Sequence, residues 1–262
     1  MLVPEPSPKL PESALAVERE EARYWLPAGR LDAVRSAVAS QLAPHHARGH
    51  TGSAEQDIAT VYFDTTGRAY YALARRSATS NVKIRAREYF ALSKNSEPRW
   101  VFIELKRREG RTTTKHRLCL AKERCEALFE SRQWWSGLGA SSVVELPAVG
   151  SFVAAEPALA EPIAPSVIAR YRRLSFQDEQ ARLRVTIDSD IAYFTLPPGG
   201  FHLARPLSGE GLGAPVHVEP RALVEVKRRG SSPSWLDHLL NAEAVPAPTF
   251  SKFSAANSAV YG

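Results

Sequence analysis

Stretches in which charged and aliphatic residues alternate recur along the chain. The alternation is clearest at residues 82–87, 104–106, 182–188 and 225–229. Successive side chains of a β-strand point to opposite faces, so a period of two predicts strands with one aliphatic and one charged face. The charged positions are mostly arginine and lysine. The pattern therefore predicts a sheet with one cationic face.

The wider pattern extends this prediction to the whole chain. Strands are predicted at residues 17–26, 58–64, 81–90, 100–107, 113–120, 167–176, 182–188, 191–196 and 222–228. Apolar residues at helical spacing predict helices at 31–42, 121–135 and 234–240, and a last element is expected at 249–253. Asp64 and Asp188 are expected to cap turns. Short polar turns between the strands of residues 81–120 indicate an antiparallel meander.

Composition favours one soluble domain with an anionic ligand. The 262 residues include 34 Lys and Arg against 28 Asp and Glu, a net charge of +6, and are 44% hydrophobic. We expect a flexible arm at residues 1–16, a single domain at 17–257 and a short tail at 258–262. No apolar run reaches the roughly 18 residues of a membrane span, and no signal core precedes the domain. We therefore expect a cytoplasmic protein in which Cys119 and Cys125 are reduced thiols.

Two carboxylates lie within the predicted cationic face. Glu104 is two residues from Lys106, and Glu225 is two residues from Lys227. If these faces closed on each other, the sheet would be a barrel with a charged lumen and helices outside, and so many like charges would require water or an anion inside. A chain of phosphates suits arginine and lysine, and a carboxylate among them can hold a divalent cation. An open sheet with one solvated face remains the alternative.

Nine short motifs occur in the same order as in the VTC domain, which the chain resembles over about residues 17–257. That domain is the catalytic domain of the vacuolar transporter chaperone polyphosphate polymerases, a branch of the triphosphate tunnel metalloenzymes. The motifs are EARYWL at 21–26, VYFDT at 61–65, KIRAR at 83–87, FIELKR at 102–107, KHR at 115–117, YRR at 171–173, LRVTID at 183–188, EVK at 225–227 and FSKF at 250–253.

The resemblance implies an α+β fold built on an antiparallel eight-stranded β-barrel tunnel with helices packed outside. It also implies transfer of the terminal phosphoryl group of ATP to orthophosphate or a growing polyphosphate, with Mn²⁺ or Mg²⁺ as cofactor and Glu225 as metal ligand. By motif position it implies catalytic roles for Arg85, Arg87, Lys106, Arg173, Arg184 and Lys227, and substrate binding by Arg23, Lys83, Lys115, Arg117, Tyr171 and Lys252. Glu104 is expected to be an ion-pair partner of Lys106 or of a neighbouring arginine.

Departures from the family pattern bear on the activity. Hydrolases of this fold open with Glu-x-Glu-x-Lys, whereas this chain has Arg19 and Arg23 in place of the first glutamate and the lysine; this disfavours a plain triphosphatase. Thr249 replaces a lysine that the family commonly has near the C-terminal element. The alternatives are a tripolyphosphate or nucleoside triphosphate hydrolase of the same fold and a non-catalytic polyphosphate binder. A nucleic-acid partner is disfavoured because the spacers are aliphatic rather than aromatic, and any coupling to a membrane would need a partner protein.

Overall fold

A single antiparallel sheet forms the centre of the molecule in the computed structural model, which describes residues 20–45, 55–77, 79–90, 100–110, 112–121, 163–197 and 209–262. Its eight long strands are β1 (Glu20–Pro27), β3 (Glu55–Thr65), β4 (Ser80–Phe90), β5 (Trp100–Glu109), β6 (Thr112–Ala121), β7 (Ile163–Asp178), β8 (Leu183–Phe194) and β10 (Arg221–Arg228). Three strands have two residues each: β2 (Ala43–Pro44), β9 (His217–Val218) and β11 (Val245–Pro246).

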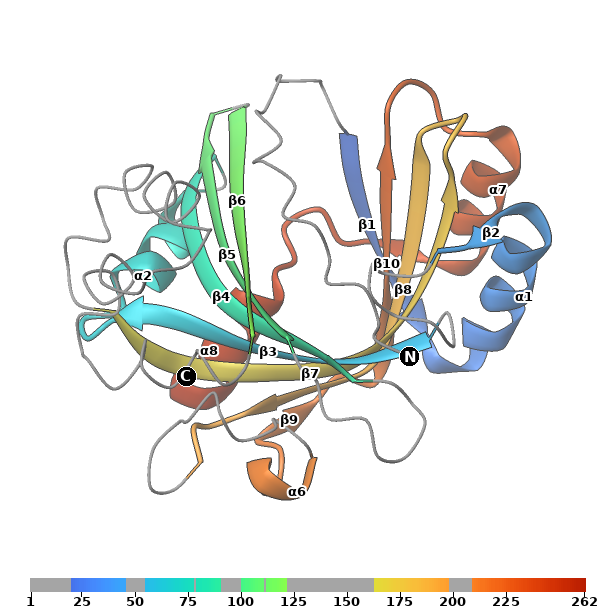
Figure 1. The fold of residues 1–262 in the computed structure, drawn as a ribbon. Coiled ribbons are helices and arrows are strands. Elements are labelled where there is room, and N and C mark those ends of the chain that lie inside the picture. The colour runs from blue at the N-terminus through green and yellow to red at the C-terminus, as the bar shows by residue number, and fades with distance from the viewer. Residues whose placement is uncertain are drawn as a thin grey trace, which may run out of the picture.

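The sheet is strongly curved. Its strand order is β11-β1-β10-β8-β7-β3-β4-β5-β6, with β2 added on β7 and β9 on β8. Figure 1 shows β4, β5 and β6 rising on one side and β1, β10 and β8 on the other, while β3 and β7 cross below and join them. We call these two sides the β4–β6 wall and the β1–β8 wall.

The sheet is not the closed eight-stranded barrel that the resemblance implied. The described strands form an eleven-stranded sheet whose path ends at β6 and β11, and within these ranges no ladder joins β6 to β1. The outer edge of β1 is instead paired with β11 at Tyr24 and Trp25. This pairing uses backbone groups that a closing strand would need.

Two groups of helices pack against the sheet. α1 (Leu31–Gln41) and α7 (Ser234–Glu243) bury Val34, Val38, Leu236 and Leu240 against aliphatic residues of β8 and β10. A second cluster packs α2 (Ala69–Arg76) and α8 (Lys252–Tyr261) against β3, β4 and β7. Two short elements, the 3₁₀ helix η1 (Ala28–Arg30) and α6 (Gly209–Leu212), complete the described structure. None of the described helices is long and apolar enough to cross a membrane.

Most predicted strands are present, and two elements differ from the prediction. The predicted strands at 182–188 and 191–196 are one strand, β8, in which Asp190 adopts a positive φ of 51°. The helix α2 was not predicted. Asp64, which was expected to cap a turn, lies at the end of β3 and instead accepts hydrogen bonds from the backbone N–H groups of Tyr70 and Tyr71 in the first turn of this helix, at 2.9 and 3.0 Å, which stabilises it. The arm at 1–16, nearly all of the predicted helix at 121–135, and Cys125 lie outside the described residues.

Candidate active site

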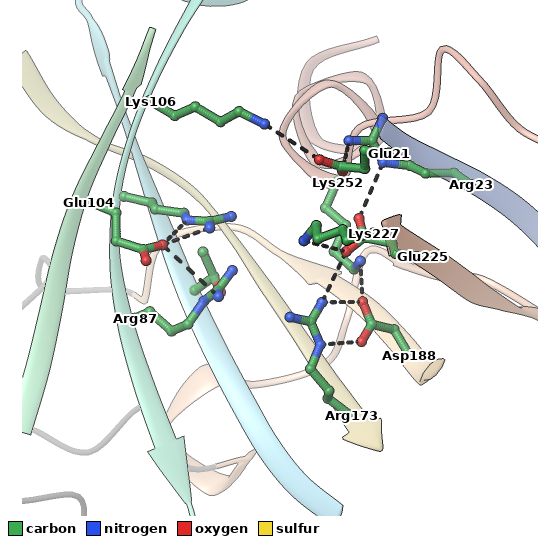
Figure 2. A network of polar contacts seen from close by, with 12 residues as sticks. Glu21, Arg23, Arg87, Glu104, Lys106, Arg173, Asp188, Glu225, Lys227 and Lys252 are labelled. Carbon is green, nitrogen blue, oxygen red and sulfur yellow. Dashed lines mark hydrogen bonds and ion pairs between the residues drawn. The ribbon is translucent and has the colours of Figure 1, made fainter. Parts of the chain in front are cut away.

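The concave face of the sheet carries the cationic residues that the alternation predicted. Directly opposite residues of antiparallel strands share a face, and the ladders place Lys227 opposite Arg184 and Lys106 opposite Lys115. The same face gathers all thirteen predicted site residues, namely Arg23, Lys83, Arg85, Arg87, Lys106, Lys115, Arg117, Tyr171, Arg173, Arg184, Glu225 and Lys227 from the strands, and Lys252 from α8. Figure 2 shows residues of the two walls facing each other across this space.

Glu104 organises the cations of the β4–β6 wall. Its carboxylate is 1% exposed and accepts hydrogen bonds from Arg85 Nε at 2.6 Å and Arg117 Nε at 2.7 Å, and it pairs with Lys115 Nζ at 2.8 Å. Burial alone would raise the pKa of Glu104, but these cations and Arg87 hold it well below its usual range. The expected ion-pair role is confirmed, although the described partners are on neighbouring strands rather than at Lys106.

Asp188 has the corresponding position in the β1–β8 wall. Its fully buried carboxylate accepts hydrogen bonds from Arg173 Nη2, at 2.7 Å, and from Lys252 Nζ. The Lys252 ammonium also lies 4.7 Å from the centre of the Tyr171 ring. The prediction that Asp188 caps a turn is therefore wrong, because the residue lies within β8. Its spacing from Arg184 in the sequence already predicts that it shares the cationic face.

Glu225 is held less tightly than these two carboxylates. Its nearest cation is Arg23 Nε at 3.2 Å, followed by Arg173 Nη2 at 3.5 Å and Lys227 Nζ at 3.7 Å. Burial would raise the pKa of Glu225, but Lys227 and the other surrounding cations hold it well below the usual range. Arg23 also bonds to Glu21, the neighbouring carboxylate on β1. The two carboxylates remain ionised and share one guanidinium.

The lysines of this face are crowded by like charges. Burial, together with Lys106 and Arg23, lowers the pKa of Lys83 to about 7. Desolvation, reinforced by Arg117, also lowers the pKa of Lys115 in spite of its contact with Glu104, although its side chain is 44% exposed and water weakens this effect. The carboxylates on this face therefore do not neutralise its cations, and an added anion would be strongly favoured.

Two neutral polar groups on the same face have no hydrogen-bond partner in the described part of the chain. They are Gln56 Nε2 and Thr186 Oγ1, whose residues are only 6% and 4% exposed. The ladders place Gln56 opposite Arg173 and Thr186 opposite Glu225. Buried polar groups are normally paired, so these two are candidates to bind a ligand or water. Sequence reasoning missed both, although Thr186 lies midway between Arg184 and Asp188 in the alternating pattern.

Comparison with known families identifies the domain. The model of the VTC domain matches residues 18–261. The chain belongs to the VTC domain family. No curated protein matches this VTC domain by sequence.

Two solved structures resemble this VTC domain at low sequence identity. A protein from Hippeastrum, named as an adenylyl cyclase and described as having a dominant triphosphatase activity, has a TM-score of 0.51 and 14% identity to this VTC domain; the match covers 91% of this chain and 94% of that one. A protein of Bacillus halodurans, assigned as an adenylate cyclase, has a TM-score of 0.48 and 14% identity, with 88% and 95% of the two chains covered. The Hippeastrum structure supports a sheet-dominated α+β fold for this VTC domain.

The oxygen-bearing side chains near Glu225 are the candidates to hold a divalent metal. The described residues of the VTC domain contain no group of three or more His, Cys, Asp or Glu side chains suited to a metal. Mg²⁺ is often held by only one or two carboxylates, with substrate phosphates supplying further ligands. Glu225, with Glu21 on the adjacent strand and the unpaired hydroxyl of Thr186 opposite, matches that arrangement.

Proposed function

We propose that this VTC domain is a polyphosphate polymerase that transfers the terminal phosphoryl group of ATP to orthophosphate or a growing polyphosphate chain. The observation that carries the proposal is the excess of cations on one concave face. Among the described residues that face has four carboxylates, and all four are engaged by cations of the same face: Glu21, Glu104, Asp188 and Glu225. A linear chain of phosphates supplies the missing negative charge along the whole face.

The proposed chemistry asks the protein for positioning and charge stabilisation. Arg85 and Arg87 from one wall and Arg173 from the other would bind phosphate oxygens and hold donor and acceptor in line. Lys106 and Lys227, which come from opposite walls, would add compact charge. A divalent metal, Mn²⁺ or Mg²⁺, would be held by Glu225 and would neutralise charge on the phosphates. No general base is needed, because the acceptor phosphate is already anionic near neutral pH.

We further propose that the eight long strands form the wall of a tunnel when the polyanion is bound. Among the described side chains, the ion pair between Lys106 Nζ and Glu21 Oε2, at 3.9 Å, reaches from one wall to the other. Phosphates placed between the walls would add further bridges, because cations face them from both sides. The ligand would then complete an enclosure that the sheet alone does not close.

Hydrolysis is the second candidate. The same cations would bind a triphosphate for attack by water, and the fold neighbour from Hippeastrum is described as a triphosphatase. The third possibility is a polyphosphate binder without turnover, for which Glu225 would be dispensable.

One experiment separates these functions. The purified protein is incubated with ATP and Mn²⁺, and acid-insoluble polyphosphate and free orthophosphate are measured in parallel. We expect a long phosphate polymer. Release of orthophosphate without polymer would establish the hydrolase instead, and polyphosphate binding without either product would establish the binder.

A further inference from the structure

A basic hollow lies at the turn between β7 and β8, beside the end of β10. It has a volume of about 330 Å³ and is lined by Gln177, Glu179, Arg182, Leu183, Arg184 and Arg229. Three of these six residues are arginines and one is a carboxylate. The hollow is therefore a second place at which this domain presents guanidinium groups together.

The hollow continues directly from the concave face. Arg184 lines it and lies opposite Lys227 in one ladder and opposite Gln177 in the other. Arg184 Nε donates to Gln177 Oε1 at 3.0 Å, which holds the guanidinium at this end of the sheet. Lys227 in turn lies opposite Glu21 of the concave face. A linear polyanion that followed this row of side chains would pass from the central cations into the hollow.

The turn that carries Arg182 is well defined. Arg182 adopts a positive φ of 50°, and its N–H donates to the carbonyl of Glu179 at 3.3 Å, while the Asp178 carboxylate accepts the N–H of Ala181 at 2.9 Å. Arg182 and Arg229 are both exposed, and within the described ranges no carboxylate pairs with either. These two guanidiniums are consequently available to an anion from outside the protein.

We propose that this hollow is a second binding site for linear polyphosphate, which holds the chain beyond the phosphates that react. The proposal rests on the proposed function only in taking polyphosphate as the ligand. Guanidinium forks match phosphate oxygens, and two exposed arginines contribute modestly to binding unless the ligand is already held nearby. On this proposal a triphosphate is held at the central cations alone, whereas a longer chain extends past Arg184 into the hollow. The site therefore distinguishes long polymers from short ones.

The test compares ligand length in a double variant. In Arg182→Ala/Arg229→Ala we expect the dissociation constant for long-chain polyphosphate to rise about tenfold. The slope of the logarithm of the binding constant against the logarithm of the salt concentration should fall in magnitude by about two, one for each lost phosphate contact. Affinity for tripolyphosphate should stay within about twofold of the wild type. The matched control is Arg172→Ala/Arg228→Ala, which removes the same charge from arginines already paired with Asp190 and Glu20, and it should change neither affinity.

Two results would overturn the proposal. Unchanged long-chain affinity in the Arg182/Arg229 variant would show that the hollow binds nothing, and an equal loss for tripolyphosphate or in the control would show a general effect of charge. A wild-type protein that bound neither polyphosphate would contradict the proposed function as well. Wild-type binding of both lengths, with loss of the long-chain preference in the variant alone, supports the second site.

Discussion

The carboxylates of the concave face differ in how firmly cations hold them. Glu104 and Asp188 have guanidinium partners at 2.6–2.7 Å, whereas the nearest cation to Glu225 is 3.2 Å away. Tightly held carboxylates fix the orientation of the cations that bind them, and this is how Glu104 and Asp188 act. The looser contacts of Glu225 are those expected of the carboxylate that we propose to hold a metal ion.

The role of Glu225 can be tested by removing its charge. We expect Glu225→Gln to lower Mn²⁺-dependent turnover of ATP about a hundredfold or more, because the metal loses its ligand. Polyphosphate affinity, measured by calorimetry, should be retained or improved, since one negative charge has left the site. Glu219→Gln is the control, as Glu219 pairs with Arg221 outside the cationic cluster. Turnover equal to that of the control would show that Glu225 does not hold the metal ion.

Asp188 should be essential to the fold when the site is empty. Asp188→Asn leaves Arg173 and Lys252 without their buried counter-charge, and loss of one partner of a buried ion pair costs about 3–5 kcal/mol. An anion would replace that charge, so tripolyphosphate should raise the melting temperature of the variant more than that of the wild type. Asp190→Asn, two residues along the same strand and exposed, is the control. Equal shifts in all three proteins would show that Asp188 does not hold these cations for a ligand.

Binding should be accompanied by proton uptake. The pKa of Lys83 is about 7 because of burial and neighbouring cations, and a bound phosphate would raise it by favouring the charged ammonium. At pH 8 the free protein therefore holds Lys83 largely neutral and binds a proton with the ligand, so affinity falls as pH rises above 7. Calorimetry in buffers of different ionisation enthalpy measures this uptake. Lys83→Arg should reduce it, and an enthalpy independent of buffer would contradict the assignment.

At the scale of whole elements, α8 links the site to the core. Its N-cap residue Ser251 accepts a hydrogen bond from Lys83 Nζ at 2.9 Å, and the next residue, Lys252, binds Asp188. One residue further on, Phe253 is 1% exposed and packs on Tyr62 with ring centres 5.3 Å apart. The first turn of this helix therefore belongs to both the cationic face and the hydrophobic cluster.

The contribution of Phe253 to the stability of the domain can be measured directly. Phe253→Ala should lower the free energy of unfolding by about 3–5 kcal/mol, because it leaves a cavity beside Tyr62 and Tyr71. Urea denaturation checks the value. Val245→Ala, at a position that is 59% exposed, should change stability by less than about 0.5 kcal/mol and serves as the control. A loss no larger than that of the control would show that α8 is not anchored through Phe253.

Sequence reasoning reached the strands, their cationic face and an ion-paired Glu104, but not which arginines of the neighbouring strands pair with it. Alternation along one strand shows which residues share a face, so it placed Glu104 with Lys106. Only the register shows what lies across from Glu104, and the ladders put Arg85 and Arg117 there. The helix α2 was not predicted because it has only eight residues and its first turn is stabilised by Asp64, which belongs to the preceding strand.

At the scale of the whole molecule, the two walls should respond to ligand as one enclosure. We expect tripolyphosphate to slow amide hydrogen exchange along β1 and β6, whose facing edges share no ladder in the described structure. Exchange in β7, which is paired on both sides, should change little and provides the internal control. Protection confined to β7 would contradict closure by the ligand.

The dual position of α8 also bears on how substitutions in this domain would be interpreted. A change on the hydrophobic side of the helix would shift Lys252 without touching any phosphate, and enzymatic output would fall as if a ligand contact had been lost. If residues were assigned to the active site only because their substitution lowers activity, residues that merely hold α8 in place would be included by mistake. Parallel measurement of protein abundance would separate positions that bind phosphate from those that only hold the helix in place.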